Sequence, residues 1–279
     1  MTSLHPRTAF ATAVATTLAV AALGVAGASG QDGEQAIGIS VAGGQATLTG
    51  ADALHPGPAA ITVAATPKEL DLTIFELKPG VTQDQVLAAA AKLKGPPTSL
   101  QQYGKFVYGS STGKGKPYTA GLTLDPATYL LIDATRAPKL VGSFTVAPGA
   151  ASGTAPTPDA TVTMKDFKIK APATLPSTGL VRFENKGKSP HFVAVARAAS
   201  KAKAEKVAEL LHMGKEKQAG KLITGDTAAV GLISPGVAND VPFKAVKKGY
   251  YVLVCFYGDS KSHGKEHSML GMETVVRVK

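Results

Sequence analysis

Residues 249–272 read GYYVLVCFYGDSKSHGKEHSMLGM and contain the one cysteine of the chain, Cys255. The first seven residues of this segment are mostly apolar and aromatic, which is typical of a buried β-strand. Cys255 ends that strand, His267 lies in the loop beyond it, and Met272 begins the closing strand. A single cysteine cannot form an intramolecular disulfide. The sequence therefore predicts that Cys255 is either buried packing or a metal ligand.

A second histidine stands upstream of this segment. His191 follows NKGKSP and opens an apolar strand over residues 191–197. With it, the chain carries His191, Cys255, His267 and Met272 in this order. Two imidazoles and a thiolate with a weak axial thioether suit a copper ion that changes oxidation state. Core packing explains each residue taken alone equally well, but the four together favour one mononuclear copper site.

These residues resemble the cupredoxin family, which includes plastocyanin and azurin. The pattern G-x-Y-x-L-x-C at residues 249–255 resembles the strand that carries the copper thiolate there. Asn185, Gly187 and the Pro190-His191 pair, all within residues 185–191, resemble the segment that bears the first imidazole. His267 and Met272 resemble the second imidazole and the axial thioether. The resemblance covers nearly all of residues 160–279 and implies a β-sandwich with one copper ion.

The ligand loop departs from the family pattern. Eleven residues separate Cys255 from His267, whereas the second histidine of the familiar blue copper proteins follows the cysteine by only a few. His263 therefore competes with His267 as the second imidazole, and Met269 competes with Met272 as the thioether. The long loop either folds back and presents His267 or leaves the site incomplete.

The same order of elements occurs twice in the chain. A stretch of small residues and proline, APGAASGTAPTPD at 147–159, is typical of a linker. It separates residues 36–146 from residues 160–279. Each half has two opening strands (the second pair being ATVTMKDFKI and GLVRFEN), an apolar strand, a helix, a tyrosine-containing strand and a closing strand. Val86 then falls on Val207 and Tyr129 on Tyr251.

The duplication predicts a mainly β protein made of two Greek-key cupredoxin-like β-sandwiches, each with a short helical insertion. The helices are expected near residues 82–93, with Thr82 and Gln85 as a capping box, and near residues 200–213, with Ser200 as N-cap. We expect the two sandwiches to be separate rather than one continuous sheet.

In the first half the ligand positions hold other residues. The register places His191 on Leu70, Cys255 on Asp133 and Met272 on Ser143, listed in chain order of the second half. We therefore predict that the first copy is degenerate and binds no copper.

The N-terminal residues have the layout of a secretory signal peptide. Arg7 precedes an apolar run over residues 9–26, and Ala26 and Ala28 suit the −3 and −1 positions of a cleavage site. A transmembrane anchor is the competing interpretation, because the run is near the lower limit for a span. Its content of Ala and Thr favours a signal peptide over residues 1–30. The sequence thus predicts a secreted or extracytoplasmic protein with no stable membrane span after cleavage.

Charge and motifs narrow the expected function. The formal net charge of +10 is spread along the chain, which excludes a nucleic-acid site and allows an anionic redox partner or cell-wall polymer. A copper ion with four protein ligands has no open position, and nucleophile-elbow, HExxH and phosphate-loop motifs are absent, so no enzyme is expected. We predict electron transfer or copper carriage. The alternative is a metal-free cell-envelope binding or structural module that kept the fold.

Overall fold

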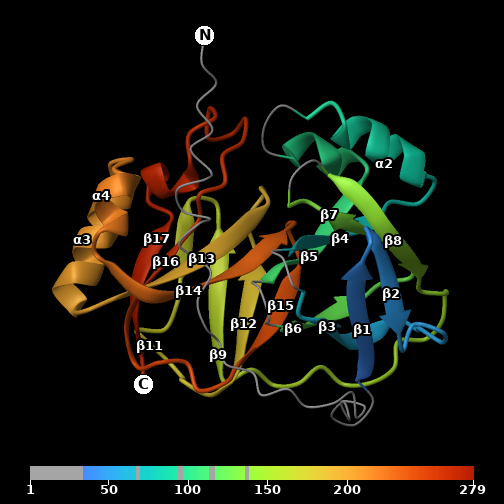
Figure 1. The fold of residues 1–279 in the computed structure, drawn as a ribbon, viewed down its shortest axis with the longest axis horizontal. Coiled ribbons are helices and arrows are strands. Elements are labelled where there is room, and N and C mark those ends of the chain that lie inside the picture. The colour runs from blue at the N-terminus through green and yellow to red at the C-terminus, as the bar shows by residue number, and fades with distance from the viewer. Residues whose placement is uncertain (1–33, 67–69, 94–96, 113–116, 136–137) are drawn as a thin grey trace.

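β-Strands are the predominant secondary structure of the computed structural model (Figure 1), which describes residues 34–66, 70–93, 97–112, 117–135 and 138–279. The mainly β class predicted from the sequence is confirmed. The predicted signal peptide, residues 1–30, lies outside the described residues. Within them, no helix is long and apolar enough to cross a membrane.

The first half contains eight strands and two helical segments. The strands are β1 (Gln35–Ala42), β2 (Gln45–Thr49), β3 (Gly57–Val63), β4 (Leu70–Leu77), β5 (Gly104–Thr112), β6 (Tyr118–Leu124), β7 (Thr128–Asp133) and β8 (Lys139–Thr145). The helical segments are α2 (Gln83–Ala90) and the 3-10 helix η1 (Pro97–Gln102).

The second half repeats this order with additions. Its strands are β9 (Ala160–Lys165), β10 (Lys168–Lys170), β11 (Thr174–Leu175), β12 (Gly179–Asn185), β13 (His191–Ala198), β14 (Ile223–Ile233), β15 (Ala238–Phe243), β16 (Gly249–Val254) and β17 (Glu273–Val278). Its helical segments are α3 (Lys201–His212), α4 (Glu216–Gly220) and the 3-10 helix η2 (His267–Leu270).

The two halves pair their strands in the same way. In the first half β1 is antiparallel to β2 and parallel to β3, and β3 is antiparallel to β6. In the second half β9, β10, β12 and β15 repeat these relations. A separate sheet in each half has the order β5-β4-β7-β8 or β14-β13-β16-β17, with β11 added beside β17.

Two tyrosines, one in each half, make the same hydrogen bond. The hydroxyl of Tyr129 on β7 donates to the carbonyl oxygen of Asp125 at 2.8 Å. The hydroxyl of Tyr251 on β16 donates to the carbonyl oxygen of Lys247 at 2.6 Å. Both partners lie four residues before the tyrosine, and both rings are buried. The register that places Tyr129 on Tyr251 thus joins residues with the same hydrogen bond.

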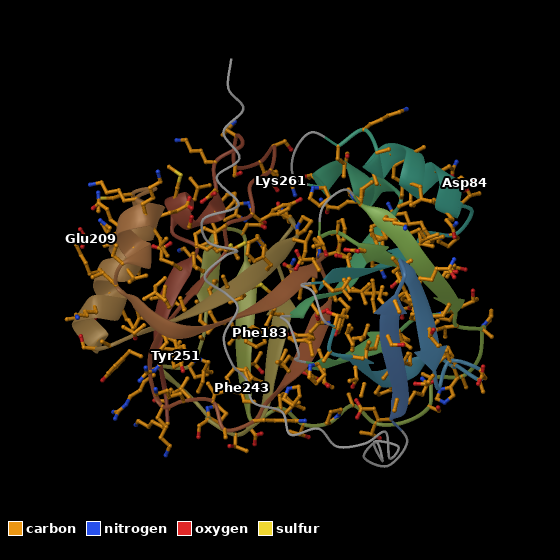
Figure 2. The ribbon with its side chains drawn as sticks, viewed as in Figure 1. Asp84, Phe183, Glu209, Phe243, Tyr251 and Lys261 are labelled. Carbon is orange, nitrogen blue, oxygen red and sulfur yellow. The ribbon has the colours of Figure 1, made fainter. Side chains whose placement is uncertain are left out.

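Each half buries its apolar residues between two sheets. In the first half, Ile37 on β1 and Ile61 on β3 pack in one cluster with Leu72 on β4, a strand of the separate sheet. In the second half, Phe183 on β12 and Tyr251 on β16 belong to the equivalent cluster (Figure 2). Alternation along the strands turns these side chains inward, and each such burial stabilises the fold by about 1.5–3 kcal/mol.

Helices cover the outer faces of the two separate sheets. Figure 1 shows α2 at one end of the molecule and α3 with α4 at the other. Val86 on α2 packs in a cluster with Leu130 of β7, and Val207 on α3 packs in a cluster with Val252 of β16. Helix α2 begins at the predicted capping box, because Gln85 N–H donates to the hydroxyl of Thr82. The two helices thus occupy the predicted places.

The expectation of two separate sandwiches was wrong for one sheet. Eight strands in the order β10-β9-β12-β15-β6-β3-β1-β2 form a sheet that runs through both halves. The halves join where β15 and β6 meet, with Asp240 opposite Gly121. Each half alone would leave this strand at the edge of a sheet, with unpaired backbone groups that favour pairing. Here β6 and β15 cover each other's edge, with the one residue pair Asp240 and Gly121 in register.

Strands β5 and β14 make a second contact between the halves. Phe106 N–H donates to Ser234 Oγ at 2.9 Å, and Ser234 N–H donates to the carbonyl oxygen of Phe106 at 2.8 Å. The side-chain amide of Asn239 donates to the carbonyl oxygen of Val107 at 2.9 Å. These bonds are buried, so they fix how the two halves lie against each other.

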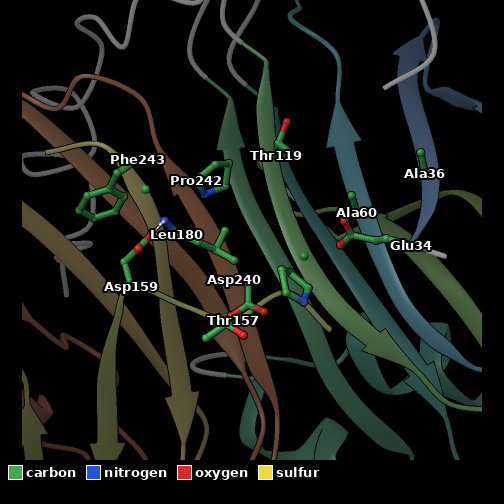
Figure 3. Close-up of a pocket in the computed structure, with 13 residues that line it drawn as sticks. Glu34, Ala36, Ala60, Thr119, Thr157, Asp159, Leu180, Asp240, Pro242 and Phe243 are labelled. Carbon is green, nitrogen blue, oxygen red and sulfur yellow. Dashed lines mark hydrogen bonds between the residues drawn. The ribbon is translucent and has the colours of Figure 1, made fainter. Parts of the chain in front are cut away.

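A groove opens on the shared sheet beside the β6–β15 junction (Figure 3). Asp240 lies in it and accepts two hydrogen bonds of 2.7 Å from the guanidinium of Arg182. Burial raises the pKa of Glu34 on the other side of the groove, and the charge of Asp240 raises this pKa further. Arg182 therefore balances Asp240, and the groove opposes ionisation of Glu34.

Candidate metal centre

Three of the four residues proposed as ligands converge in the interior of the second half. The Nδ1 atoms of His191 and His267 lie 3.1 Å apart. The sulfur of Cys255 lies 3.9 Å from His191 Nδ1 and 3.8 Å from His267 Nδ1. All three side chains have no solvent exposure. Among the described residues, they form a group of ligand atoms within 4.8 Å of one another that could hold a metal ion.

Neighbouring strands bring these residues together. His191 begins β13 and Cys255 follows β16, and these two strands are antiparallel neighbours, with Ala194 opposite Val254. His267 begins η2, whose next residue, Ser268, donates its N–H to the carbonyl oxygen of Cys255 at 2.8 Å. The donors therefore meet at one end of the separate sheet.

The turn before His191 is braced by a buried amide. Asn185 donates from its side chain to the carbonyl oxygens of Ser189 at 2.8 Å and Ile233 at 2.9 Å. Gly187 N–H donates to the side-chain oxygen of Asn185 at 2.9 Å. A Cβ on Gly187 would lie 2.8 Å from His191 Nε2, so the absence of a side chain at Gly187 makes room for the imidazole.

The long loop between Cys255 and His267 folds back as a hairpin. Gly258 and Glu266 form an antiparallel bridge across it. Asp259 N–H donates to Ser262 Oγ, and Ser262 N–H donates to Asp259 Oδ1, both at 2.9 Å. The loop thus returns the chain to the site, and the histidine that approaches Cys255 is His267.

The two competing residues lie on the surface. His263 is exposed in the loop and has a positive φ of 55°. Met269 is 38% exposed, whereas Met272 is fully buried in the apolar cluster that includes Cys255. The backbone of Met272 is tied to the site, because Cys255 N–H donates to its carbonyl oxygen at 3.1 Å. Burial therefore favours Met272 over Met269 as the neighbour of the three donors.

Each imidazole faces a carboxylate on its outer side. His191 Nε2 lies 3.4 Å from Asp166 Oδ1, and His267 Nε2 lies 3.7 Å from Asp259 Oδ1. These distances are at or beyond the limit of a hydrogen bond, and neither Nε2 has a well-aligned partner. Carboxylates beside the outer nitrogen of a metal-binding histidine orient the ring and raise its basicity. The arrangement leaves Nδ1 of each ring for a metal.

Asp166 and its neighbour Phe167 were not among the predicted site residues. The segment ATVTMKDFKI was predicted to be a strand, whereas in the structure the chain turns between β9 and β10, with Lys165 opposite Lys168. Phe167 adopts a positive φ of 63° in this turn, and its ring centroid lies 4.8 Å from that of His267. The polar pair Lys165-Asp166 inside an apolar alternation was the available signal for a turn.

Tyr257, in the loop after β16, contacts two of the three donors, His267 and Cys255. Its carbonyl oxygen accepts a 2.8 Å hydrogen bond from His267 N–H. Its ring meets the ring of His267 edge-on, with centroids 5.6 Å apart. The backbone N–H of Tyr257 and that of Phe192 are hydrogen-bonded to Cys255 and counteract the effect of burial on its thiol. Sequence reasoning missed Tyr257 as well.

Burial favours the uncharged forms of the three donor groups in the metal-free protein. It raises the pKa of the Cys255 thiol to about 12, despite the two backbone N–H groups. Burial, together with the neighbouring His267, lowers the pKa of His191 to about 4, against the pull of Asp166. Burial also lowers the pKa of His267, although Asp259 opposes this. One soft sulfur and two neutral imidazoles form a donor set that fits a copper ion.

No protein-family model and no curated protein matches the chain. Similar solved structures include the reduced auracyanin from Roseiflexus castenholzii, at 21% identity and a TM-score of 0.28 over 43% of this chain and 94% of that one. Another is auracyanin A, a blue copper protein from Chloroflexus aurantiacus, at 16% identity and a TM-score of 0.27 over 43% and 96%. The His-Cys-His group is consistent with a cupredoxin site.

Multicopper oxidases are also among the similar structures. The blue copper oxidase from Nitrosomonas europaea matches at 14% identity and a TM-score of 0.23, over 88% of this chain and 85% of that one. These matches contradict the prediction that the chain is not an enzyme, and that prediction is withdrawn. The prediction rested on the closed ligand set of one copper site and on the absence of three catalytic motifs.

Proposed function

We propose that the chain is a copper-binding, cupredoxin-like protein that holds one copper ion between His191, Cys255 and His267. The observation that carries the proposal is the convergence of three buried donor atoms, 3.1–3.9 Å apart. Met272 is the proposed axial ligand, because it is buried beside Cys255. When bound, copper would supply one-electron chemistry.

The surroundings of the donors suit electron transfer or copper carriage. The ligands lie at the end of a hydrogen-bonded sheet and in a loop with its own hydrogen bonds. Such a rigid donor set limits rearrangement when the ion changes oxidation state, and burial excludes water from it. The site can therefore keep the ion in place during either task.

The remaining sequence-based expectations belong to this proposal. We place the protein outside the cytoplasmic membrane after removal of residues 1–30. Residues 36–146 and 160–279 would be tandem Greek-key sandwiches joined by the linker 147–159, the first without ligands. Lys261 lies on the loop beside the site (Figure 2), and with the net charge of +10 it favours an acidic redox protein as partner.

Copper titration of the purified protein, with the thiol kept reduced, tests the proposal. We expect one ion per chain and a strong visible band from thiolate-to-copper charge transfer. Cys255→Ser should lose the band and most of the affinity, whereas the matched variant His263→Ser should keep both. If the wild-type protein takes up no copper, the proposal is wrong and the metal-free envelope module stands.

A pair of methionine variants tests the axial position. Met272→Leu should keep copper but change the reduction potential, because a weak axial ligand tunes the site more than it holds it. Met269→Leu should leave the potential unchanged, since Met269 is exposed. Equal effects of both substitutions would exclude Met272 as a ligand.

Two further measurements separate electron transfer from copper carriage. Reversible reduction and reoxidation with the copper retained, at a rate that an acidic redox protein increases, would indicate electron transfer. Release of Cu(I) to a chelator or acceptor on reduction would indicate carriage.

A further inference from the structure

We propose that Thr98 of the first half is a positioning residue for the copper site of the second half and acts through Tyr257. This inference rests on the proposed function, because it concerns the same site. It also gives the half without ligands a role in the chemistry. The contact that carries it is a 2.8 Å hydrogen bond between Thr98 Oγ1 and the hydroxyl of Tyr257, which are 159 residues apart.

Thr98 is held firmly on the first half. It lies in η1, where Leu100 is buried in the apolar cluster under α2. Lys78 Nζ donates to the carbonyl oxygens of Gln101 and Gln102, both at 3.0 Å. The hydroxyl of Thr98 is therefore presented from an anchored segment.

Tyr257 links the Thr98 hydroxyl to two of the donors. It is 4% exposed, and its ring, carbonyl oxygen and N–H contact the ring of His267, the backbone of His267 and Cys255 respectively. Any displacement of the phenol at one end thus moves groups that touch two donors at the other. A hydrogen bond at the far end of the ring restrains that motion.

The contacts between the halves make the restraint rigid. The buried hydrogen bonds of Phe106 with Ser234 and of Asn239 with Val107 fix the first half against the second. Because the two halves are fixed, the Thr98 hydroxyl defines a fixed point for the Tyr257 hydroxyl. The geometry points to a first half that orients the imidazole of His267 and the environment of the Cys255 sulfur.

The test compares Thr98→Val with Thr98→Ser in the full chain. Loss of a group that orients a metal ligand typically lowers metal affinity about 10–100-fold, and we expect about 10-fold for Thr98→Val, with a shifted charge-transfer band. Thr98→Ser keeps the hydroxyl and should restore both. Thr62→Val is the matched control, because it removes a 3.0 Å hydroxyl contact with Thr119 within the first half, and should alter neither.

A double-mutant cycle separates positioning from a general loss of stability. Tyr257→Phe should reproduce the change in the band, and adding Thr98→Val to it should have little further effect, because both remove the same bond. Additive effects would contradict the proposal. So would a wild-type band in Thr98→Val.

Nuclear magnetic resonance of the metal-free protein keeps the inference testable without copper. Thr98→Val should shift the ring resonances of His267, and Thr62→Val should not. If wild-type protein binds no copper, the proposed function fails, and these resonances alone decide whether Thr98 positions His267. If copper binds but Thr98→Val changes neither band nor resonances, the inference fails and the proposed function stands.

Discussion

Copper binding should be coupled to the release of fewer than two protons, and pH is the perturbation that reveals it. Burial raises the pKa of Cys255 to about 12 and lowers that of His191 to about 4. It also lowers the pKa of His267 below its usual value. At pH 5.5 the thiol is therefore protonated and His191 is neutral. Because a metal binds the thiolate and neutral imidazoles, the thiol contributes one proton, His191 almost none, and His267 fewer than an ordinary imidazole would.

The magnitude follows from these protonation states. One proton lost per copper ion makes the affinity fall about 10-fold for each pH unit, or about 100-fold from pH 7 to pH 5. Two imidazoles with the ordinary pKa of about 6.5 would add about 1.5 decades each over the same range. An exposed version of this site would thus lose about five decades, whereas the buried one should lose about two from the thiol and less than about 1.5 from His267.

Isothermal titration calorimetry at pH 5.5 in buffers of different ionisation enthalpy counts the protons directly. We expect a value between one and two, against nearly three for ordinary imidazoles and an ordinary thiol. His263→Ser is the control, because that exposed imidazole should contribute nothing. A count near three, or a count that falls in His263→Ser, would refute the argument from burial.

Three other predictions concern stability. The pKa of His191 is lower in the folded than in the unfolded protein, so as pH falls the unfolded protein takes up the proton first. Stability that is present above pH 6.5 is therefore lost as pH falls to 4. Denaturation of the metal-free protein should show a loss of about 3 kcal/mol between pH 7 and 4, and His191→Leu should lack this loss. Tyr251→Phe should lower the free energy of unfolding by about 1 kcal/mol, since it removes one buried hydrogen bond; no change in the denaturation midpoint would contradict this. Phe167→Gly relieves a positive φ that costs about 1–2 kcal/mol, and it removes a ring contact with His267. The free energy of unfolding should therefore change by less than about 1 kcal/mol, while copper affinity falls. A large loss of stability would show that the ring serves the core.

Local sequence features predicted much of this structure. The capping box at Thr82 and the N-cap at Ser200 each start a helix, because caps act within one turn of chain. The strand before Cys255 could be predicted from its apolar run. His191, Cys255 and His267 could be proposed as neighbours because of the family resemblance, since their spacing along the chain exceeds what local rules describe.

The remainder depended on contacts that no local pattern records. The turn at Asp166 looks like a continuation of a strand, and only the folded chain shows that it faces His191. Thr98 is an ordinary polar residue before a buried leucine, and its partner Tyr257 lies in the other half. The joining of β6 to β15 follows from edges that become available only after each half has formed its own pairs.

The way β6 meets β15 has a consequence for how the chain could diverge. The two strands hold the same place in their halves and run antiparallel where they meet, which is the geometry of a two-fold symmetric homodimer. The chain is thus built like a dimer whose two subunits share one polypeptide. In a true homodimer every substitution occurs twice, so losing a ligand empties both sites. Under the proposed function, Leu70 stands where the other half has His191, so one subunit-like half could lack a metal and specialise as support for the other.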